Sequence, residues 1–191
     1  MSQHSGPFLL VHIDRCMGCL TCEVACAVAH TRSSGLAGAM LAVEPLSPRT
    51  RVVEVLGKRF PMQCRQCEDA PCVKVCPTHA TYRTETYTAV DPNRCIACRL
   101  CMMVCPFGAI HIGTVLADGH RKTTAIKCDL CVNRAEGPAC VSSCPTRAIY
   151  EANPKDVRET SIQISSERYL AALTSEAKLV SEHGPLAHPS G

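Results

Sequence analysis

The sequence predicts an α+β protein in which short strands and short helices connect cysteine-rich loops, and in which one unit occurs twice in tandem. Sixteen of the 191 residues are cysteine, whereas the chain has no Trp, three Phe and four Tyr. The cysteines form four regularly spaced groups, and the last two groups repeat the first two. Short segments rich in β-branched residues separate the groups. The apolar core is thin for this length, and we therefore expect groups bound by cysteine to organise the interior.

The four cysteine groups, here called motifs, show two kinds of spacing. In chain order they are Cys16-x2-Cys19-x2-Cys22-x3-Cys26, Cys64-x2-Cys67-x4-Cys72-x3-Cys76-Pro, Cys95-x2-Cys98-x2-Cys101-x3-Cys105-Pro and Cys128-x2-Cys131-x8-Cys140-x3-Cys144-Pro. The third motif repeats the spacing of the first, and the fourth is a lengthened version of the second. Every cysteine belongs to one of the motifs.

This spacing indicates [4Fe–4S] clusters. One tight loop can supply three thiolates to a cluster, and the cysteine that follows after three residues supplies a ligand to a neighbouring cluster. Zinc sites favour two ligand pairs set apart, and disulfides are rare in reducing compartments. Cys101 and Cys105 are one helical turn apart, roughly 6 Å of rise, which would place two clusters close together. The sequence therefore predicts four [4Fe–4S] clusters, and a zinc-scaffolded interaction module is the alternative from another class.

Charge and targeting signals limit the function further. The formal charge is +3, but four oxidised clusters, each with a net charge of about −2 when held by four thiolates, would bring it to about −5. Nucleic-acid binding is therefore not expected. The sequence shows no signal peptide and no run of 18 apolar residues. We expect a cytoplasmic protein without a transmembrane segment, which could associate peripherally with the cytoplasmic membrane face through a partner.

No catalytic site is recognisable. The eight His show no ligand spacing, and the chain has no phosphate-binding loop or nucleophile triad. We therefore expect an electron-transfer subunit of an oxidoreductase system, with no catalytic residues, rather than an enzyme.

The strands can be predicted in order along the chain. Residues 8–13 are expected to form a strand that leads into the first motif, and residues 52–55 form a second β-rich stretch. Gly57 is the expected turn after that stretch. Two hairpins are predicted further on, from residues 81–83 with 87–90 and from residues 109–112 with 124–126, with Asp118-Gly119 in the second loop.

The first half contains an insertion, residues 27–63, which is expected to be loop and hairpin. Ala27 stands where the other three motifs have Pro, so the chain can continue as a helix at that point. The predicted four-cluster domain covers residues 1–150, with the first two motifs in 8–80 and the last two in 88–150.

Residues 151–191 are a predicted C-terminal extension. Apolar residues recur at helical spacing after a Ser165/Ser166 cap and predict an amphipathic helix from about 165 to 181, followed by a disordered tip. They are Tyr169, Leu170, Leu173, Ala177 and Val180. Packing on its own domain is the expected role of this helix, and docking on a partner or a membrane surface are the alternatives.

A cation precedes the first cysteine of three motifs, namely Arg15, Arg94 and Lys127, whereas Gln63 takes this place in the second motif. A positive charge near a cluster favours its reduced state and raises its potential. A solvated side chain beside a loop is an equally good interpretation. If the charges do set potentials, the second motif's cluster should differ from the others.

With the four motifs laid out, the chain from Val11 to Tyr150 resembles the four-cluster ferredoxin-like electron-transfer subunits of complex redox enzymes. These include subunits of formate dehydrogenases, formate-linked hydrogenases and enzymes of the dimethyl-sulfoxide-reductase type. The resemblance implies tandem bacterial-type two-[4Fe–4S] ferredoxin-like units. The stretches 22–30 and 67–78 are most similar to the CooF-type iron–sulfur partner of nickel carbon monoxide dehydrogenase.

The resemblance also implies crossed ligation, in which three cysteines of one motif are completed by one from a distant motif. The implied ligand sets are set A (Cys16, Cys19, Cys22 with Cys144), set B (Cys128, Cys131, Cys140 with Cys26), set C (Cys64, Cys67, Cys72 with Cys105) and set D (Cys95, Cys98, Cys101 with Cys76). The leading hypothesis is a relay from carbon monoxide dehydrogenase to a hydrogenase or other acceptor. The alternative is an iron–sulfur subunit of a formate dehydrogenase, hydrogenase or molybdenum oxidoreductase complex.

Overall fold

The computed structural model of the protein describes residues 6–183, with side chains as far as residue 170. The chain divides into two compact units, Met1–Asn153 and Pro154–Gly191, and each is described by itself. The tip that the sequence predicts to be disordered, beyond residue 183, lies outside the described residues.

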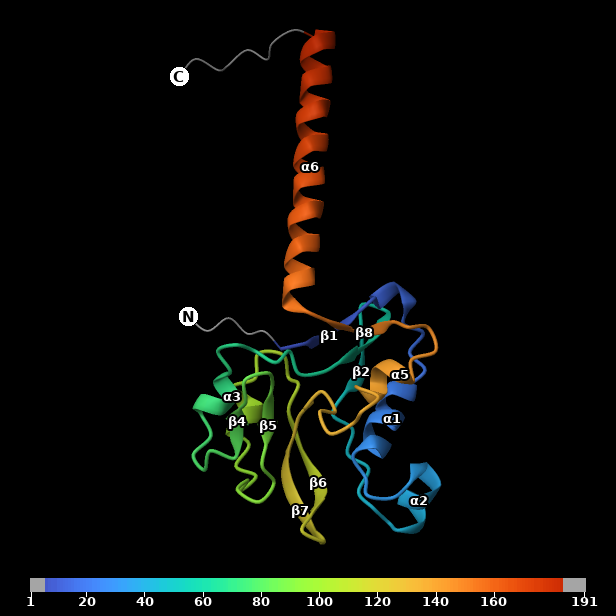
Figure 1. Ribbon diagram of the computed structural model, residues 1–191, viewed down its shortest axis with the longest axis vertical. Helices are drawn as coiled ribbons and strands as arrows, with labels where there is room; N and C mark the ends of the chain where they lie inside the picture. The colour runs from blue at the N-terminus through green and yellow to red at the C-terminus, as the bar shows by residue number, and fades with distance from the viewer. Residues whose placement is uncertain (1–5, 184–191) are drawn as a thin grey trace. The chain divides into compact units, whose positions relative to one another are not determined.

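Residues 6–153 of the first unit form four small two-stranded antiparallel sheets (Figure 1). The sheets pair β1 with β8, β2 with β3, β4 with β5 and β6 with β7. The strands are β1 (Phe8–Val11), β2 (Arg51–Val55), β3 (Lys58–Met62), β4 (Thr81–Arg83), β5 (Thr88–Val90), β6 (His111–Ala117), β7 (His120–Ile126) and β8 (Ile149–Ala152). All strands that the sequence predicts are present, although β6 and β7 are longer than expected.

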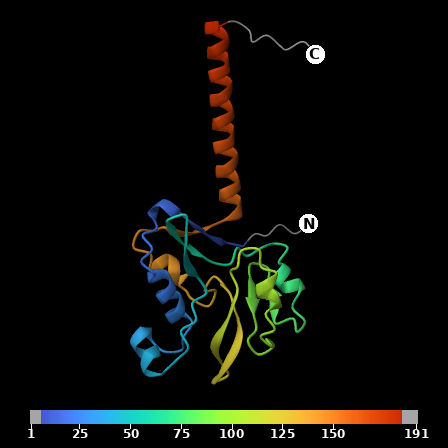
Figure 2. The same cartoon turned by 180° about the vertical axis from the view of Figure 1, so that it is seen from behind.

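Two of the hairpins close through turns whose two central residues both have positive φ. They are Leu56-Gly57, with φ of 50° and 73°, and Asp118-Gly119, with φ of 49° and 83°. Such turns match the right-handed twist of paired strands, and glycine adopts this conformation without strain. In both views the β6–β7 hairpin lies between the β4–β5 hairpin and the helices α1 and α2 (Figures 1 and 2).

The pairing of β1 with β8 was not predicted. Phe8 lies opposite Ala152 and Val11 opposite Ile149, and the backbone amide of His12 donates to the carbonyl of Ala148 at 2.8 Å. The start of the first motif and the end of the fourth are thereby placed side by side.

The helices of the first unit are short, and four of them carry cysteines. They are α1 (Thr21–Ala29), α2 (Gly35–Leu41), α3 (Pro71–Lys74), α4 (Leu100–Met103) and α5 (Ala139–Ser142), together with a 3-10 turn, η1 (Ile13–Arg15). The third cysteine of each motif lies in α1, α3, α4 or α5. α1 alone among these four continues past the fourth cysteine of its motif, as Ala27 in place of Pro predicts. The insertion contains the β2–β3 hairpin, in agreement with the loop and hairpin expected from the sequence, and also the helix α2, which was not expected.

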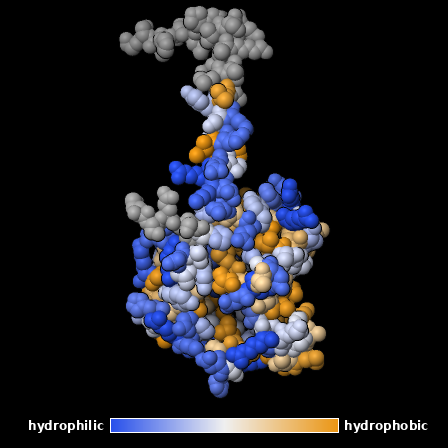
Figure 3. Space-filling view, in the orientation of Figure 1, coloured by the Kyte–Doolittle hydropathy of each residue, from blue (hydrophilic) through white to orange (hydrophobic). Residues whose placement is uncertain are grey.

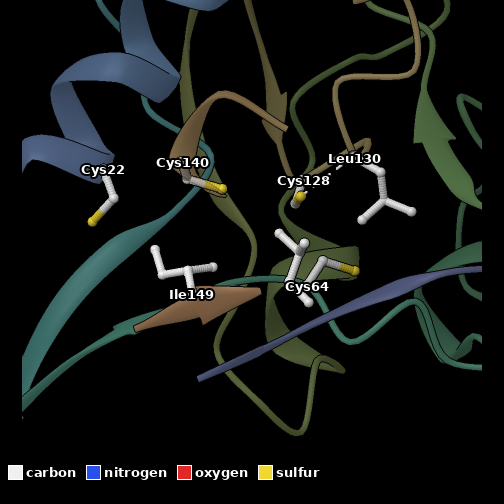
Figure 4. Close-up of a cluster of buried hydrophobic side chains, with 7 residues drawn as sticks. Cys22, Cys64, Cys128, Leu130, Cys140 and Ile149 are labelled. Atoms are coloured by element: carbon white, nitrogen blue, oxygen red, sulfur yellow. Dashed lines mark hydrogen bonds between the residues drawn. The ribbon is translucent and has the colours of Figure 1, made fainter. Parts of the chain in front are cut away.

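Cysteine side chains make up much of the core. Cys22, Cys64, Cys128 and Cys140 are buried together with Leu9, Leu130 and Ile149 in one cluster (Figure 4). A second cluster contains Cys72 and Cys101 beside Ile110. Several apolar side chains remain at the surface among hydrophilic ones (Figure 3). The first unit is therefore a mixture of short helices and small antiparallel sheets, as expected of a ferredoxin-like α+β domain. The tandem relationship of its halves stays a prediction.

The second unit contains one helix, α6 (Pro154–His183), which begins well before the predicted start at Ser165. Proline is favourable in the first turn of a helix, and nothing between Pro154 and Ser165 would interrupt one. The hydroxyl of Ser166 donates to the carbonyl of Ile162 at 2.8 Å inside the helix, an arrangement of mid-helix serines rather than of a cap.

The apolar face that the sequence predicts falls mostly on residues beyond Leu170, whose side chains lie outside the described part of α6, and it stays a prediction. Nearer the start of α6, the apolar residues do not gather on one face. Val157 and Ile164 lie seven residues apart on one face, whereas Ile162 and Tyr169 lie on the opposite face. Where this helix docks stays a prediction. Within residues 6–183, no helix is both long and apolar enough to cross a membrane.

Candidate metal centres

Three cavities of the first unit are each lined by four cysteines. Each cavity combines three cysteines of one motif with a single cysteine from a distant motif. The four are Cys16, Cys19, Cys22 and Cys144 in the first cavity, Cys64, Cys67, Cys72 and Cys105 in the second, and Cys76, Cys95, Cys98 and Cys101 in the third. The structure therefore brings together the cysteines of sets A, C and D.

The four cysteines of set B are all buried. Burial raises the pKa of the Cys140 thiol to about 12, and the nearby thiols of Cys26 and Cys131 raise it as well. Burial likewise raises the pKa of Cys128, with further contributions from Cys140 and Cys26. These mutual effects place the four sulfurs of set B in one neighbourhood.

This donor set fits a cluster. Buried thiolates without a cation would repel one another in a region of low dielectric, which is costly. A bound metal deprotonates its thiol ligands and supplies the balancing positive charge. Sixteen free cysteines, gathered four by four, are therefore suited to hold iron as thiolates.

The backbone of each motif turns its amides toward sulfur. The residue two positions after the first cysteine has positive φ in all four motifs: Gly18, Gln66, Ala97 and Leu130. Three of these amides, those of Gln66, Ala97 and Leu130, donate to that cysteine's sulfur, each at 3.4 Å. Amide donors to sulfur stabilise the thiolate and the electron-rich cluster. In the sequence only Gly18 signals this turn.

Set B has a polar neighbour that the motifs do not reveal. The ring of His30 contacts the carbonyl of Cys26 through Nδ1 at 2.7 Å and the carboxylate of Asp129 through Nε2 at 3.1 Å. Arg49 forms an ion pair with the other oxygen of Asp129. The backbone amide of Arg49 donates to the sulfur of Cys26 at 3.2 Å. These residues lie far apart in the sequence, and no spacing connects them.

The charges of this network support one another. Burial alone would lower the pKa of His30, but hydrogen bonds to Asp129, Cys131 and Cys26 raise it to about 11. Burial would raise the pKa of Asp129, but the hydrogen bond from His30 and the charge of Arg49 hold it well below its usual range. His30, Asp129 and Cys131 also lie close enough to share a metal ion. Because Asp129 is paired with Arg49 and Cys131 belongs to set B, we assign the network to the support of set B.

Shared elements and buried contacts link the sets to one another. Sets A and B share α1, which carries Cys22 and Cys26. Sets C and D meet where Cys101 in α4 is followed by Cys105. Cys64 of set C and Cys128 of set B belong to the same buried cluster (Figure 4).

Solvent exposure distinguishes the ends of this series. Of the sixteen cysteines, all within the described residues, only Cys19 of set A and Cys98 of set D are exposed. Exposed apolar side chains lie beside each: Met17, 65% exposed, lines the cavity of set A, and Ile96, 64% exposed, lines that of set D.

Fold and sites together define a small iron–sulfur protein built on a ferredoxin-like α+β unit. Residues 55–153 match the family model described as a 4Fe–4S dicluster domain, and residues 13–29 match a 4Fe–4S binding domain. The chain belongs to the 4Fe–4S dicluster family of electron-transport proteins and carries four [4Fe–4S] clusters.

Named relatives agree with this assignment. An iron–sulfur protein of Rhodospirillum rubrum is 48% identical over 145 residues, which cover 71% of this chain and 76% of the relative. Electron transport protein HydN of Escherichia coli (strain K12) is 40% identical over 151 residues, covering 74% and 85%. Formate hydrogenlyase subunit 2 of the same strain is 33% identical over 183 residues, covering 81% and 85%.

Proposed function

We propose that the protein passes single electrons along its four clusters in the order A, B, C, D, and that it does so as a subunit without catalytic residues of its own. The exposure of Cys19 at one end and of Cys98 at the other carries this proposal, because set B between them is buried. A series with two accessible ends and a buried middle suits transfer between two partners. Names of relatives such as electron transport protein HydN favour the same role.

We further propose that each set of four cysteines is the ligand set of one cluster. The three cavities lined by four cysteines support this assignment for sets A, C and D. The mutual effects among the buried thiols support it for set B. The bound clusters accept and release one electron each, and the surrounding apolar side chains exclude water from them.

For the partner, the similarity to a formate hydrogenlyase subunit favours an oxidoreductase complex that uses formate or hydrogen. The names of the relatives described above give no support to carbon monoxide dehydrogenase as the donor. That hypothesis, which the sequence suggested first, is therefore included as the third arm of the donor test below. A cytoplasmic location, with any membrane association made through a partner, stays a prediction.

Anaerobic purification with metal analysis tests the relay. We expect about sixteen iron per chain, broad absorption near ~400 nm and a paramagnetic signal after dithionite reduction. A colourless folded protein with about four zinc and no iron would overturn the proposal in favour of a zinc-scaffolded module.

Reduction by candidate donors tests the partner. The oxidised protein is mixed in turn with formate dehydrogenase and formate, with hydrogenase and hydrogen, and with carbon monoxide dehydrogenase and carbon monoxide, and bleaching is followed over time. We expect faster bleaching in the formate or hydrogen arm. Fast bleaching by carbon monoxide dehydrogenase alone would restore the first hypothesis and leave the relay intact.

A further inference from the structure

Lys127 differs from the other cations that precede a motif. Arg15 and Arg94 are exposed, whereas Lys127 is only 3% exposed. It follows β7 directly and precedes Cys128 of set B. The two interpretations that the sequence left open are therefore distinguished: a solvated side chain describes Arg15 and Arg94, but it does not describe Lys127.

The hydrogen bonds of Lys127 indicate an ammonium group. Its Nζ donates to the carbonyl of Thr88 at 2.7 Å, to the hydroxyl oxygen of Thr88 at 2.5 Å and to the carbonyl of Cys128 at 3.3 Å. The Thr88 hydroxyl donates its own hydrogen to Oε1 of Gln66 at 2.9 Å, so its oxygen is free to accept from Lys127. Three acceptors thus face the three N–H donors of an ammonium.

This group lies at the junction of sets B and C. Gln66, 1% exposed, stands between Cys64 and Cys67 of set C, and its Nε2 donates to the carbonyl of Cys128 at 2.9 Å. Its Oε1 also accepts from the amide of Thr88 at 2.9 Å. The side chains of Gln66, Thr88 and Lys127 therefore join the loop of set C to the loop of set B through buried hydrogen bonds.

Nothing in the described part of the chain neutralises this charge by a direct ion pair. All the oxygens that accept from Lys127 are uncharged. A buried ammonium without a counter-charge is costly. Thiolate-held clusters carry net negative charge, and the two inner clusters are the counter-ions that this position lacks.

We propose that Lys127 sets the reduction potentials of the two inner clusters, those of sets B and C, by stabilising the extra negative charge of their reduced states. Gln66 and Thr88 are positioning residues that hold the ammonium between the two loops. This inference rests on the proposed function. The absence of a cation at Gln63 would predict that the second motif's cluster differs from the others. In this proposal, however, set C receives the positive charge of Lys127 from the fourth motif.

The substitution Lys127→Met tests the proposal, since it removes the charge and keeps the unbranched apolar stem. The four potentials are measured by redox titration of the anaerobic holoprotein with mediators, monitored by electron paramagnetic resonance. We expect two of the four reduction potentials to fall by about 59 mV, which corresponds to a tenfold change in the equilibrium constant of a one-electron reduction. The other two potentials should stay unchanged. Lys127→Arg keeps the positive charge, and most of the downward shift in the two potentials should therefore be absent from this variant.

Lys122→Met is the matched control. Lys122 lies on β7, the strand that Lys127 follows, and its Nζ donates to the carbonyl of Asn93 at 2.8 Å at an exposed site. All four potentials should stay unchanged in this variant.

Iron content is measured for every variant. If Lys127→Met loses iron, Lys127→Gln replaces it, since glutamine keeps N–H donors without the charge, and the same two shifts are expected. Unchanged potentials in a fully loaded Met or Gln variant would overturn the inference and leave the relay standing. Absence of clusters from the wild-type protein would instead overturn the proposed function.

Discussion

At the scale of single residues, the cysteines depend on neighbours that donate hydrogen bonds to sulfur or carry charge. Gln66, Ala97 and Leu130 donate to sulfur in the motif loops, and His30 and Asp129 form the network beside Cys26. Sixteen cysteines at typical spacings are visible without a structure. The supporting positions Gln66, Ala97 and Leu130 are not, because positive φ is usually signalled by glycine and only Gly18 follows that rule. His30 and Asp129 are hidden for another reason: their contact depends on how distant segments fold together, and single-sequence patterns report only local structure.

The contact of Asp129 with His30 and Arg49 leads to a prediction about set B. Asp129→Asn removes the charge that pairs with Arg49 and weakens the hydrogen bond to His30. The side chains of all three residues are largely buried. We expect a loss of about 2 kcal/mol of stability, because hydrogen bonds between charged groups contribute about that much. When the variant is titrated anaerobically with guanidinium, the cluster absorption near ~400 nm should be lost at a lower denaturant concentration than in the wild-type protein.

Glu54→Gln serves as the control for that measurement. Glu54 pairs with Arg59, and both side chains are more than half exposed, at 56% and 58%. Exposed ion pairs contribute little, so this variant should bleach like the wild type. If Asp129→Asn also bleached like the wild type, the network would not stabilise set B.

At the scale of elements, local pattern predicts hairpins and helix continuation, but not long-range pairing. The β4–β5 and β6–β7 hairpins join neighbouring segments across short turns, and alternation with turn residues reveals them. The β1–β8 pair joins residues from opposite ends of the unit, and Ile149–Ala152 carries no local signal of its partner. The predicted start of α6 is too late because serine is typical of helix caps, whereas the Ser166 hydroxyl donates to a carbonyl inside the helix.

The length of α1 gives a prediction at this scale. Ala27, 6% exposed, lies inside α1, between Cys26 and His30. Ala27→Pro should end the helix at Cys26, at a cost of about 3 kcal/mol. Cys26 and His30 would then be displaced from set B. We expect iron to fall from about sixteen to about twelve per chain, measured together with sulfide.

Ala27→Gly separates helix breakage from loss of the side chain. Glycine costs only about 1 kcal/mol inside a helix and keeps the backbone donor, so this variant should keep all its iron. A fully loaded Ala27→Pro protein would show that the continuation of α1 is not needed to complete set B.

At the scale of the whole molecule, the proposed order A, B, C, D gives the two ends different partners. Sets A and D each contain an exposed cysteine. Met17, 65% exposed, lines the cavity of set A, and Met103, 76% exposed, lies on α4, the helix that carries Cys101 of set D. Apolar surface beside an exposed redox group is typical of protein interaction sites. Neither residue is within a ligand set, so each can be changed without removing a cluster.

Met17→Glu and Met103→Glu should therefore impair opposite halves of the relay. A buried carboxylate in a docked interface is costly, so we expect about tenfold slower electron transfer at the altered end and unchanged transfer at the other. Stopped-flow mixing with the donor measures entry, and mixing of the reduced protein with the acceptor measures exit. Leu41→Glu on α2, where Leu41 is 87% exposed, is the control for surface charge and should leave both rates unchanged. If Met17→Glu and Met103→Glu slowed the same half-reaction, electrons would enter and leave through one end, and the linear order A, B, C, D would be wrong.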